Sequence, residues 1–149
     1  MSHSIPKEAG FTLLELLVVI VIIGLLAGYV APRYFSQVGK SEIQVAKAQI
    51  ESLEKALDQF RLDTRHYPNA EQGLAALVAM PANEPGWSGP YLKKAVPMDP
   101  WGRAYMYRVP GEKSEFDLFS YGRDGKAGGS GEDADIGLGA VTSTVSSIK

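Results

Sequence analysis

The feature that most constrains this chain is a long apolar run near its amino terminus that contains one acid. After Glu15 no charged residue occurs until Arg33. As a helix, residues 11–31 would extend about 31 Å at roughly 1.5 Å per residue, which is enough to cross the hydrocarbon core of a bilayer. A carboxylate inside such a helix costs about 2.5–3.5 kcal/mol on insertion scales, so it is usually paired or functional. The run therefore predicts a membrane-spanning helix whose single acid needs a cation.

Two explanations of Glu15 remain open from the residues alone. In the simpler one, the carboxylate lies near the membrane interface and reaches water. In the other, cleavage after Gly10 frees an ammonium group on Phe11, which pairs with Glu15 of the same chain or of a neighbouring chain. An ordinary cleaved secretory signal is disfavoured, because its apolar region is typically about 7–15 residues long.

Length and composition restrict the remaining possibilities. A chain of 149 residues allows one membrane helix and one small soluble domain. Its 15 basic and 17 acidic residues leave a net charge of −2, which argues against a general nucleic-acid surface. The chain has no cysteine, so disulfides, thiol catalysis and zinc-thiolate sites are excluded. We therefore expect a membrane partner and no nucleic-acid partner.

The helical pattern continues beyond the apolar run. Apolar residues recur there at spacings of three and four, with charged residues between them, which predicts an amphipathic helix that ends near residue 63. Glycine and proline at the junction lower helix propensity, so bending or local melting is expected there. The apolar positions are Ile43, Ala46, Ile50, Leu53, Leu57 and Phe60, and the junction residues are Gly24, Gly28 and Pro32.

The carboxyl-terminal half has a different pattern. We expect a short helix over residues 70–80 and an irregular, proline-rich loop over 81–100. Two aromatic-rich runs, 104–109 and 116–121, flank a Pro110-Gly111 turn and predict an antiparallel hairpin. Packing of its apolar face on the amphipathic helix gives an α+β fold, in which the aromatic side chains fill the core rather than stack on bases.

A glycine-rich loop over residues 121–135 carries four acids, Asp124, Glu132, Asp133 and Asp135. Hard oxygen donors on a flexible backbone suit calcium, although a solvated acidic loop is the simpler interpretation of these residues. The loop is not an EF-hand, because Lys126 and Gly128 stand where an EF-hand has ligands.

The chain resembles a known family at several motifs. Gly10-Phe11-Thr12-Leu13-Leu14-Glu15, followed by the apolar helix and Pro32, resembles the class III signal of type IV pilins and pseudopilins. Further motifs resemble the major pseudopilins of type II secretion systems, so that the resemblance covers residues 10–137. These motifs are Tyr67-Pro68, Gln72-Gly73-Leu74, Tyr91-Leu92-Lys93, Asp99-Pro100-Trp101-Gly102 and residues 117–136.

The resemblance implies a domain organisation and a processing route. Residues 1–10 would be a prepilin leader, 11–32 a transmembrane and filament-core helix, 33–137 a periplasmic globular domain and 138–149 a flexible tail. Prepilin peptidase would cut between Gly10 and Phe11, Phe11 would become N-methylated, and Glu15 would be the acid required for assembly. Glu8 is a departure, since leaders of this family usually carry only basic residues.

The resemblance also implies one structural calcium ion (Ca²⁺) in the loop over residues 121–135. Asp124 and Asp135 match the first and last acids of the family, and Asp133, Ser130 and the carbonyl of Tyr121 are the next candidate ligands. Calcium would neutralise the carboxylates and fix the loop in a chain that has no disulfide. Leu138-Gly139 replaces the usual Asn-Trp, and a Ser/Thr-rich tail extends the chain.

By this resemblance, the chain is the major structural subunit of a type II secretion pseudopilus, a filament that drives export of folded proteins across the outer membrane. Expected partners are further copies of the chain in a helical filament, prepilin peptidase, minor pseudopilins and an inner-membrane assembly platform. The expected location is the bacterial inner membrane, crossed once, with the carboxyl-terminal domain in the periplasm.

Three alternatives remain. A major pilin of a type IV or DNA-uptake pilus would be expected to carry a carboxyl-terminal cysteine pair, which this sequence lacks. A monomeric calcium sensor would need no cleavage after Gly10. A membrane-anchored enzyme has little support, because His66 is the sole histidine outside the leader and has no evident catalytic partner, so we expect no enzymatic activity.

Overall fold

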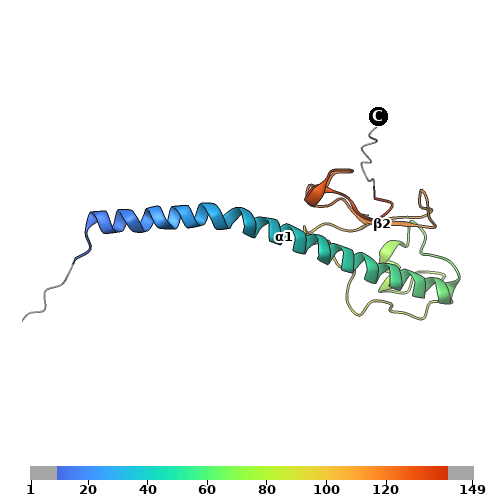
Figure 1. The fold of residues 1–149 in the computed structure, drawn as a ribbon. Coiled ribbons are helices and arrows are strands. Elements are labelled where there is room, and N and C mark those ends of the chain that lie inside the picture. Colours follow the sequence, from blue (N-terminus) through green and yellow to red (C-terminus); the bar gives the residue numbers. More distant parts are fainter. Residues whose placement is uncertain (1–9, 141–149) are drawn as a thin grey trace, which may run out of the picture. The chain divides into compact units, whose positions relative to one another are not determined.

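The computed structural model describes residues 10–140, so most of the expected leader and residues 141–149 of the expected tail lie outside the described part. One long helix, three short strands and two short 3₁₀ helices make up the fold (Figure 1). In chain order they are α1 (Leu13–Thr64), η1 (Gly73–Leu77), β1 (Met106–Arg108), β2 (Asp117–Ser120), η2 (Gly131–Asp133) and β3 (Ile136–Leu138). The chain divides into two compact units, Met1–Val38 and Gly39–Lys149, which we describe separately.

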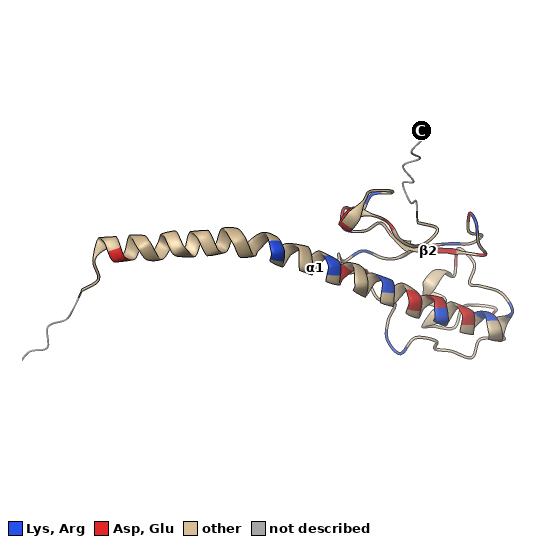
Figure 2. Cartoon of the chain, in the orientation of Figure 1, with Lys and Arg blue, Asp and Glu red and all other residues tan. Residues whose placement is uncertain are grey.

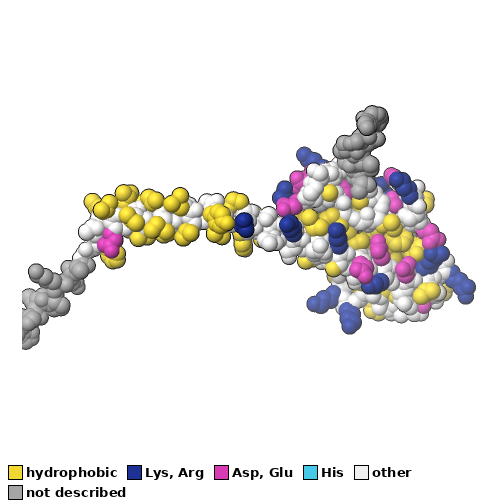
Figure 3. Space-filling model, in the orientation of Figure 1, with side chains coloured by type: hydrophobic (Ala, Val, Ile, Leu, Met, Phe, Trp, Pro, Cys, Tyr) yellow, Lys and Arg dark blue, Asp and Glu magenta, His cyan; other side chains and the backbone are white. Residues whose placement is uncertain are grey.

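The first unit, as far as it is described, consists of the start of helix α1. Its charged residues are Glu15 near the helix start and Arg33, and the stretch between them is uncharged (Figure 2). An 18-residue window of the helix reaches a mean hydropathy of 2.7, so its length and composition suit a membrane span. Its large apolar side chains are exposed along the whole stretch (Figure 3). A surface of this kind needs a lipid or protein environment to cover it.

In the second unit, one side of helix α1 is buried against the rest of the domain, as the spacing of apolar residues predicts. Ile43 is half-buried at its edge, and polar residues such as Glu51 and Lys55 occupy the exposed side. Side chains from the carboxyl-terminal half, including Tyr105, Phe116 and Leu118, complete the same core. The buried residues of α1 are Gly39, Ala46, Ile50, Leu53, Ala56, Leu57 and Phe60.

The sheet is antiparallel, with β2 between β1 and β3. The predicted hairpin is confirmed, since Tyr107 pairs with Leu118, but β3 was not predicted. In β3, Ile136 pairs with Ser120 and Gly137 with Phe119. Three residues with a central glycine carry too little alternation to be recognised as a strand from the sequence. The strand ends at Leu138, the first residue of the segment predicted to be a flexible tail.

All four residues of β2 are buried, so this strand does not show the alternation typical of a strand with one solvent face. Leu118 belongs to the core shared with α1. Phe119, the next residue, lies edge-on to Tyr121, and the Arg108 guanidinium lies 5.0 Å from its ring centre. Aromatic and cationic side chains therefore cover the second face of this short sheet.

Two further expectations differ from the structure. The helix predicted over residues 70–80 is present only as the five-residue η1, which begins at Gly73 with a positive φ of 54°. Of the bending or local melting expected at the junction, melting is not observed, because α1 is helical on both sides of Pro32. The long apolar and amphipathic stretches that flank Pro32 are strong helix formers, and their helical turns outweigh the one backbone hydrogen bond that proline removes.

Replacing Phe60 by alanine tests the core between α1 and the rest of its unit. The side chain is fully buried and lies 5.6 Å from the Tyr91 ring, centre to centre, so F60A should lower the free energy of unfolding by about 3–5 kcal/mol. Urea denaturation of the full chain in detergent, followed by tryptophan fluorescence, measures this. Leu62→Ala on the same helix is the control, because Leu62 is 74% exposed and should change stability by less than about 0.5 kcal/mol. Equal effects of the two variants would contradict this assignment of the core.

Candidate functional sites at the start of α1 and in the glycine-rich loop

The expected cleavage site lies immediately before α1. Residues 10–12 are not helical, and Gly10 and Phe11 are both exposed, with Phe11 82% exposed. The helix begins at Leu13, where the Thr12 hydroxyl accepts a hydrogen bond from the Glu15 backbone N–H at 3.2 Å. Thr12 therefore caps the helix and leaves the Gly10–Phe11 peptide bond outside it.

Glu15 is exposed in the first turn of α1. The spacing Thr12-Leu13-Leu14-Glu15 is that of a capping box, a signal that the sequence analysis missed. An acid in the first helical turn also interacts favourably with the helix dipole. In the described part of this unit, however, Arg33 is the only basic residue, and 18 residues of helix place it about 27 Å away. Within the described residues of its unit, Glu15 is therefore out of reach of a cationic side chain.

The loop over residues 121–135 is closed by backbone contacts between its two ends. The Arg123 N–H donates to the Glu132 carbonyl at 3.3 Å, and the Asp135 N–H donates to the Gly128 carbonyl at 3.1 Å. Gly122 and Gly129 have φ of 67° and 80°, and a Cβ there would lie 2.5 Å from the Ala134 oxygen and 2.3 Å from the Asp133 oxygen. Only glycine permits this close approach, which explains why the loop is glycine-rich.

The candidate calcium ligands occupy different environments in this loop. Asp135 is buried, and its carboxylate accepts the Gly128 N–H at 3.0 Å. Asp124 is exposed and accepts the Lys126 N–H, whereas Asp133 accepts the Arg123 Nε–H at 2.9 Å. Ser130 is exposed at the start of η2, and Tyr121 is half-buried at the end of β2.

The oxygen chemistry of these residues fits calcium, since carboxylates, a hydroxyl and a backbone carbonyl are its usual ligands. Their positions do not yet form a coordination shell. Among residues 10–140, no group of three or more acidic, histidine or cysteine side chains gathers within reach of one ion. Calcium binding would therefore require the Asp133 carboxylate to leave Arg123, or the use of backbone oxygens together with Asp124 and Asp135.

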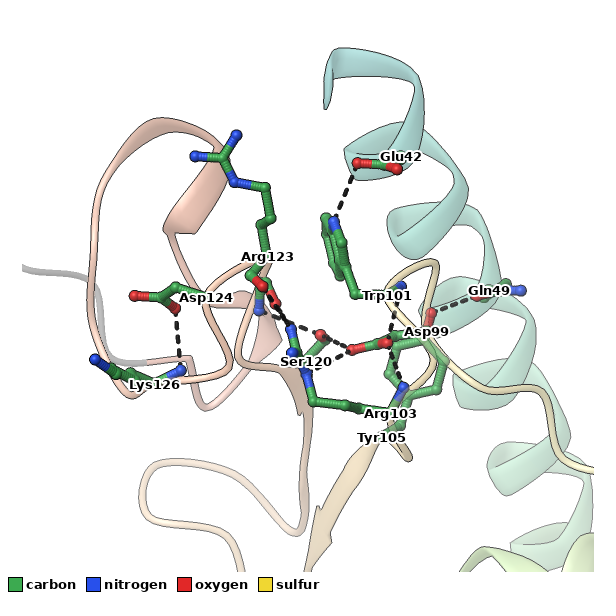
Figure 4. A network of polar contacts seen from close by, with 11 residues as sticks. Glu42, Gln49, Asp99, Trp101, Arg103, Tyr105, Ser120, Arg123, Asp124 and Lys126 are labelled. Atoms are coloured by element: carbon green, nitrogen blue, oxygen red, sulfur yellow. Dashed lines mark hydrogen bonds and ion pairs between the residues drawn. The ribbon is translucent and has the colours of Figure 1, made fainter. Parts of the chain in front are cut away.

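A buried carboxylate, that of Asp99, lies beside the start of this loop (Figure 4). One oxygen of Asp99 accepts the backbone N–H groups of Trp101 and Arg103, at 3.1 and 2.8 Å. The other accepts the Ser120 hydroxyl at 2.6 Å, and the Ser120 oxygen in turn accepts the Gly122 N–H. Asp99 therefore holds the tight turn at residues 99–103 and connects it to the end of β2.

The same turn connects helix α1 to the loop. Trp101 Nε1 donates to Glu42 of α1 at 3.0 Å, and the Tyr105 hydroxyl donates to Gln49 of α1 at 2.5 Å. Burial raises the pKa of Tyr105 to about 12, so the hydroxyl remains a donor throughout the physiological range. Arg103 donates to the carbonyls of Gly122 and Arg123, near the start of the loop.

His66 has a partner that the sequence did not reveal. Its Nε2 lies 3.2 Å from one carboxylate oxygen of Glu84, a buried residue, and the other oxygen accepts the Gln72 amide N–H. The pair borders a hollow of about 710 Å³, and the described residues that line it include no serine, threonine or cysteine. The contact joins the segment that follows α1 to the later loops, as expected of a structural interaction.

Asp99→Ala tests whether this carboxylate holds the turn. The variant leaves two partly buried backbone N–H groups and the Ser120 hydroxyl without their acceptor, so the free energy of unfolding should fall by about 2–4 kcal/mol. Asp99→Asn is the matched control, because its amide oxygen can still accept both N–H groups and should lose less than half as much. Urea denaturation followed by fluorescence of Trp101, the nearest tryptophan, measures both. Equal losses would show that the charge rather than the hydrogen-bond geometry matters.

Comparison with known proteins places these features in a family. A family model described as "Type II secretion system (T2SS), protein G" matches residues 33–139, and one described as "Prokaryotic N-terminal methylation motif" matches residues 5–31. The first match contains the amphipathic part of α1, the Asp99 turn and the glycine-rich loop. The second contains the expected cleavage site and Glu15.

Curated relatives and a solved structure agree with these matches. The chain is 46% identical over 134 residues to the type II secretion system core protein G of Pseudomonas aeruginosa, covering 88% of this chain and 94% of that protein. It is 48% identical over 134 residues to core protein G of Vibrio cholerae, covering 88% and 91%. A crystal structure of the major pseudopilin from the type 2 secretion system of enterohaemorrhagic Escherichia coli matches with a TM-score of 0.54 and 38% identity, covering 69% of this chain and 90% of that one. The resemblance inferred from the motifs is thus confirmed, and the chain belongs to the type II secretion system protein G family.

Proposed function

We propose that this chain is the major subunit of a type II secretion pseudopilus. The observation that carries the proposal is the combination of the two family matches in one chain, with the methylation motif at residues 5–31 and the protein G domain at 33–139. The long exposed apolar stretch of α1 supports it, because such a surface suits both a bilayer and a bundle of identical helices. The relatives named core protein G and the matched pseudopilin structure do not favour the alternative of a type IV or DNA-uptake pilin.

Processing would begin at the Gly10–Phe11 peptide bond. The exposure of both residues and the helix cap at Thr12 leave this bond accessible to prepilin peptidase. Cleavage would make Phe11 the amino-terminal residue, and its amino group would become methylated. Methylation to a secondary amine preserves the positive charge at neutral pH, so the group could still pair with a carboxylate.

Glu15 would use that new charge. The described helix offers it no nearby cation, and the first turn of α1 exposes its carboxylate. In a bundle of staggered α1 helices, the Phe11 ammonium group of one subunit would pair with Glu15 of the next. In the low dielectric of the bundle, the attraction between these two charges would be stronger than in an exposed ion pair.

The mature protein would be anchored in the inner membrane by α1, with its second unit in the periplasm. An assembly platform in the inner membrane would add subunits to the filament, together with minor pseudopilins. Growth of the filament would drive folded proteins across the outer membrane. In this role the chain contributes a structural surface rather than catalysis.

Glu15→Ala tests the assembly step. The variant is expressed in a bacterial strain from which the chromosomal gene for this protein has been deleted. The variant should insert in the membrane and lose its leader at the normal rate, yet filament incorporation and secretion should fall at least about tenfold, since the new terminus lacks its counter-ion. Immunoblots of precursor and mature protein, shearing of filaments and assay of secreted enzymes measure the three steps. Glu15→Asp is the control that keeps the charge, and it should retain partial function. Normal secretion by E15A would contradict the role of this acid.

We also propose that the loop over residues 121–135 binds one calcium ion. The support is the oxygen chemistry of Asp124, Asp133, Asp135, Ser130 and the Tyr121 carbonyl, together with a backbone that glycines allow to curve tightly. The ion would neutralise neighbouring carboxylates. It would thereby stabilise the loop that leads into β3.

Thermal unfolding of the full chain in detergent tests the calcium proposal. Calcium at about 100 times its dissociation constant should stabilise the native protein by about 2.7 kcal/mol relative to EGTA. Asp124→Ala should lose most of this gain but melt normally in EGTA, because Asp124 is exposed and its one hydrogen-bond partner is a local backbone N–H. Glu71→Ala, which removes an exposed acid outside the loop, should keep the full response. A melting temperature of the unmodified protein that ignores EGTA would contradict calcium binding.

A further inference from the structure

The glycine-rich loop carries its own cation, Arg123. The Arg123 Nε–H donates to the Asp133 carboxylate at 2.9 Å, and a terminal nitrogen donates to the Glu132 carboxylate at 2.5 Å. The Arg123 backbone N–H also donates to the Glu132 carbonyl, at 3.3 Å. One residue at the start of the loop thus makes three contacts with two consecutive residues near its end.

Helix α1 contributes to the surroundings of this arginine. The pKa of Arg123 is raised above its ordinary value, chiefly by the hydrogen bond to Asp133 and further by the charges of Asp133, Glu132 and Glu42 of α1. The Glu132 carboxylate packs directly on Gly39, where a Cβ would lie 2.3 Å from it. The guanidinium group thus contacts two acids of the loop, and the charge of an acid on α1 acts in the same direction.

A second arginine fixes the backbone from which Arg123 projects. Arg103 donates to the carbonyl of Arg123 at 2.9 Å and to that of Gly122, and its own backbone is held by Asp99. In Figure 4 the carbonyl of Arg123 faces Arg103, while the Arg123 side chain extends away from Asp99. This support reduces the conformational freedom that the salt bridges would otherwise have to restrict.

We propose that Arg123 acts as an internal cation that closes the loop over residues 121–135 in the absence of a metal ion, by holding the carboxylates of Glu132 and Asp133. The loop contains four acids within twelve residues, so a positive charge between its ends relieves their repulsion. A guanidinium group suits this task because its fixed donors can contact two carboxylates at once.

The internal cation has a consequence for the proposed calcium site. Asp133 is both a partner of Arg123 and a candidate calcium ligand. If its carboxylate binds calcium, its attraction to the Arg123 guanidinium group becomes weaker. Arg123 therefore competes with calcium and weakens its binding. This consequence rests on the proposed calcium site, whereas closure of the metal-free loop by Arg123 does not.

The effect on stability should be moderate. The side chains of Arg123, Glu132 and Asp133 are 51%, 29% and 37% exposed, so water and salt screen their attraction. In EGTA, Arg123→Gln in the full chain should lower the melting temperature by about 2–5 °C at low ionic strength. The difference should shrink in 1 M NaCl, which a loss of packing alone would not produce.

The matched control is Lys126→Gln, which removes one positive charge from the same loop. Lys126 is exposed, and it contributes its backbone N–H rather than its ammonium group to the hydrogen bond with Asp124. Its melting temperature in EGTA should be unchanged. An R123Q melting temperature equal to that of K126Q and of the unmodified protein would overturn the proposal.

Addition of Asp133→Asn to R123Q completes a double-mutant cycle in EGTA. If Arg123 acts through this carboxylate, the two changes should lower the melting temperature by less than the sum of their separate effects. Strict additivity would contradict the direct contact between them.

Calcium titration separates this proposal from the calcium proposal. Isothermal calorimetry should show R123Q binding calcium several-fold more tightly than the unmodified protein, and calcium should raise its melting temperature by more. Equal or weaker calcium binding by R123Q would overturn the competition. If neither protein binds calcium but R123Q still melts lower in EGTA, the calcium site is refuted and the internal cation is supported.

Discussion

The second unit of this protein depends on the burial of one face of α1. A helix alone cannot cover the stripe from Ala46 to Phe60, so the carboxyl-terminal half must supply the opposite surface. It does so with a three-stranded sheet of very short strands and with side chains from long irregular segments, such as Tyr91 and Trp87. Strands of three or four residues gain little from their own hydrogen bonds, and contact with the helix stabilises them. The same helix that begins as an exposed apolar segment thus becomes the largest element of the domain core.

Polar contacts then determine how the irregular segments are held. Asp99 can be buried because its carboxylate accepts hydrogen bonds from two backbone N–H groups and one hydroxyl. These bonds hold a segment that lacks regular secondary structure. Trp101 and Tyr105 extend the same turn to α1 through side-chain hydrogen bonds. The backbone donors of Trp101 and Arg103 belong to a segment without regular structure, where they would otherwise remain unpaired.

Sequence patterns predicted the elements whose signal is periodic. The helix and its buried face follow from spacings of three and four residues, and the β1–β2 hairpin follows from two aromatic-rich runs that flank a turn. The confirmed family resemblance follows from short motifs such as Gly10–Glu15. Strand β3 and the small extent of η1 were not predicted, because segments of three to five residues are decided by tertiary contacts rather than by local pattern. The partners of His66 and Arg123 were equally hidden, since Glu84 and Asp133 become neighbours only when the loops fold.

Glu15 and the acids of the glycine-rich loop illustrate two solutions to one electrostatic problem. In the described part of its unit, Glu15 has no cation within reach along the helix, so its counter-charge has to come from elsewhere, and in the proposed filament it comes from a second subunit. Asp133 and Glu132 have a cation from their own chain, in Arg123, which makes their charge independent of any partner. An acid without an internal counter-ion favours assembly, whereas acids with one favour a loop that is already folded before assembly. In the proposed filament, the positions of these charges would therefore separate the part of the chain that associates from the part that folds alone.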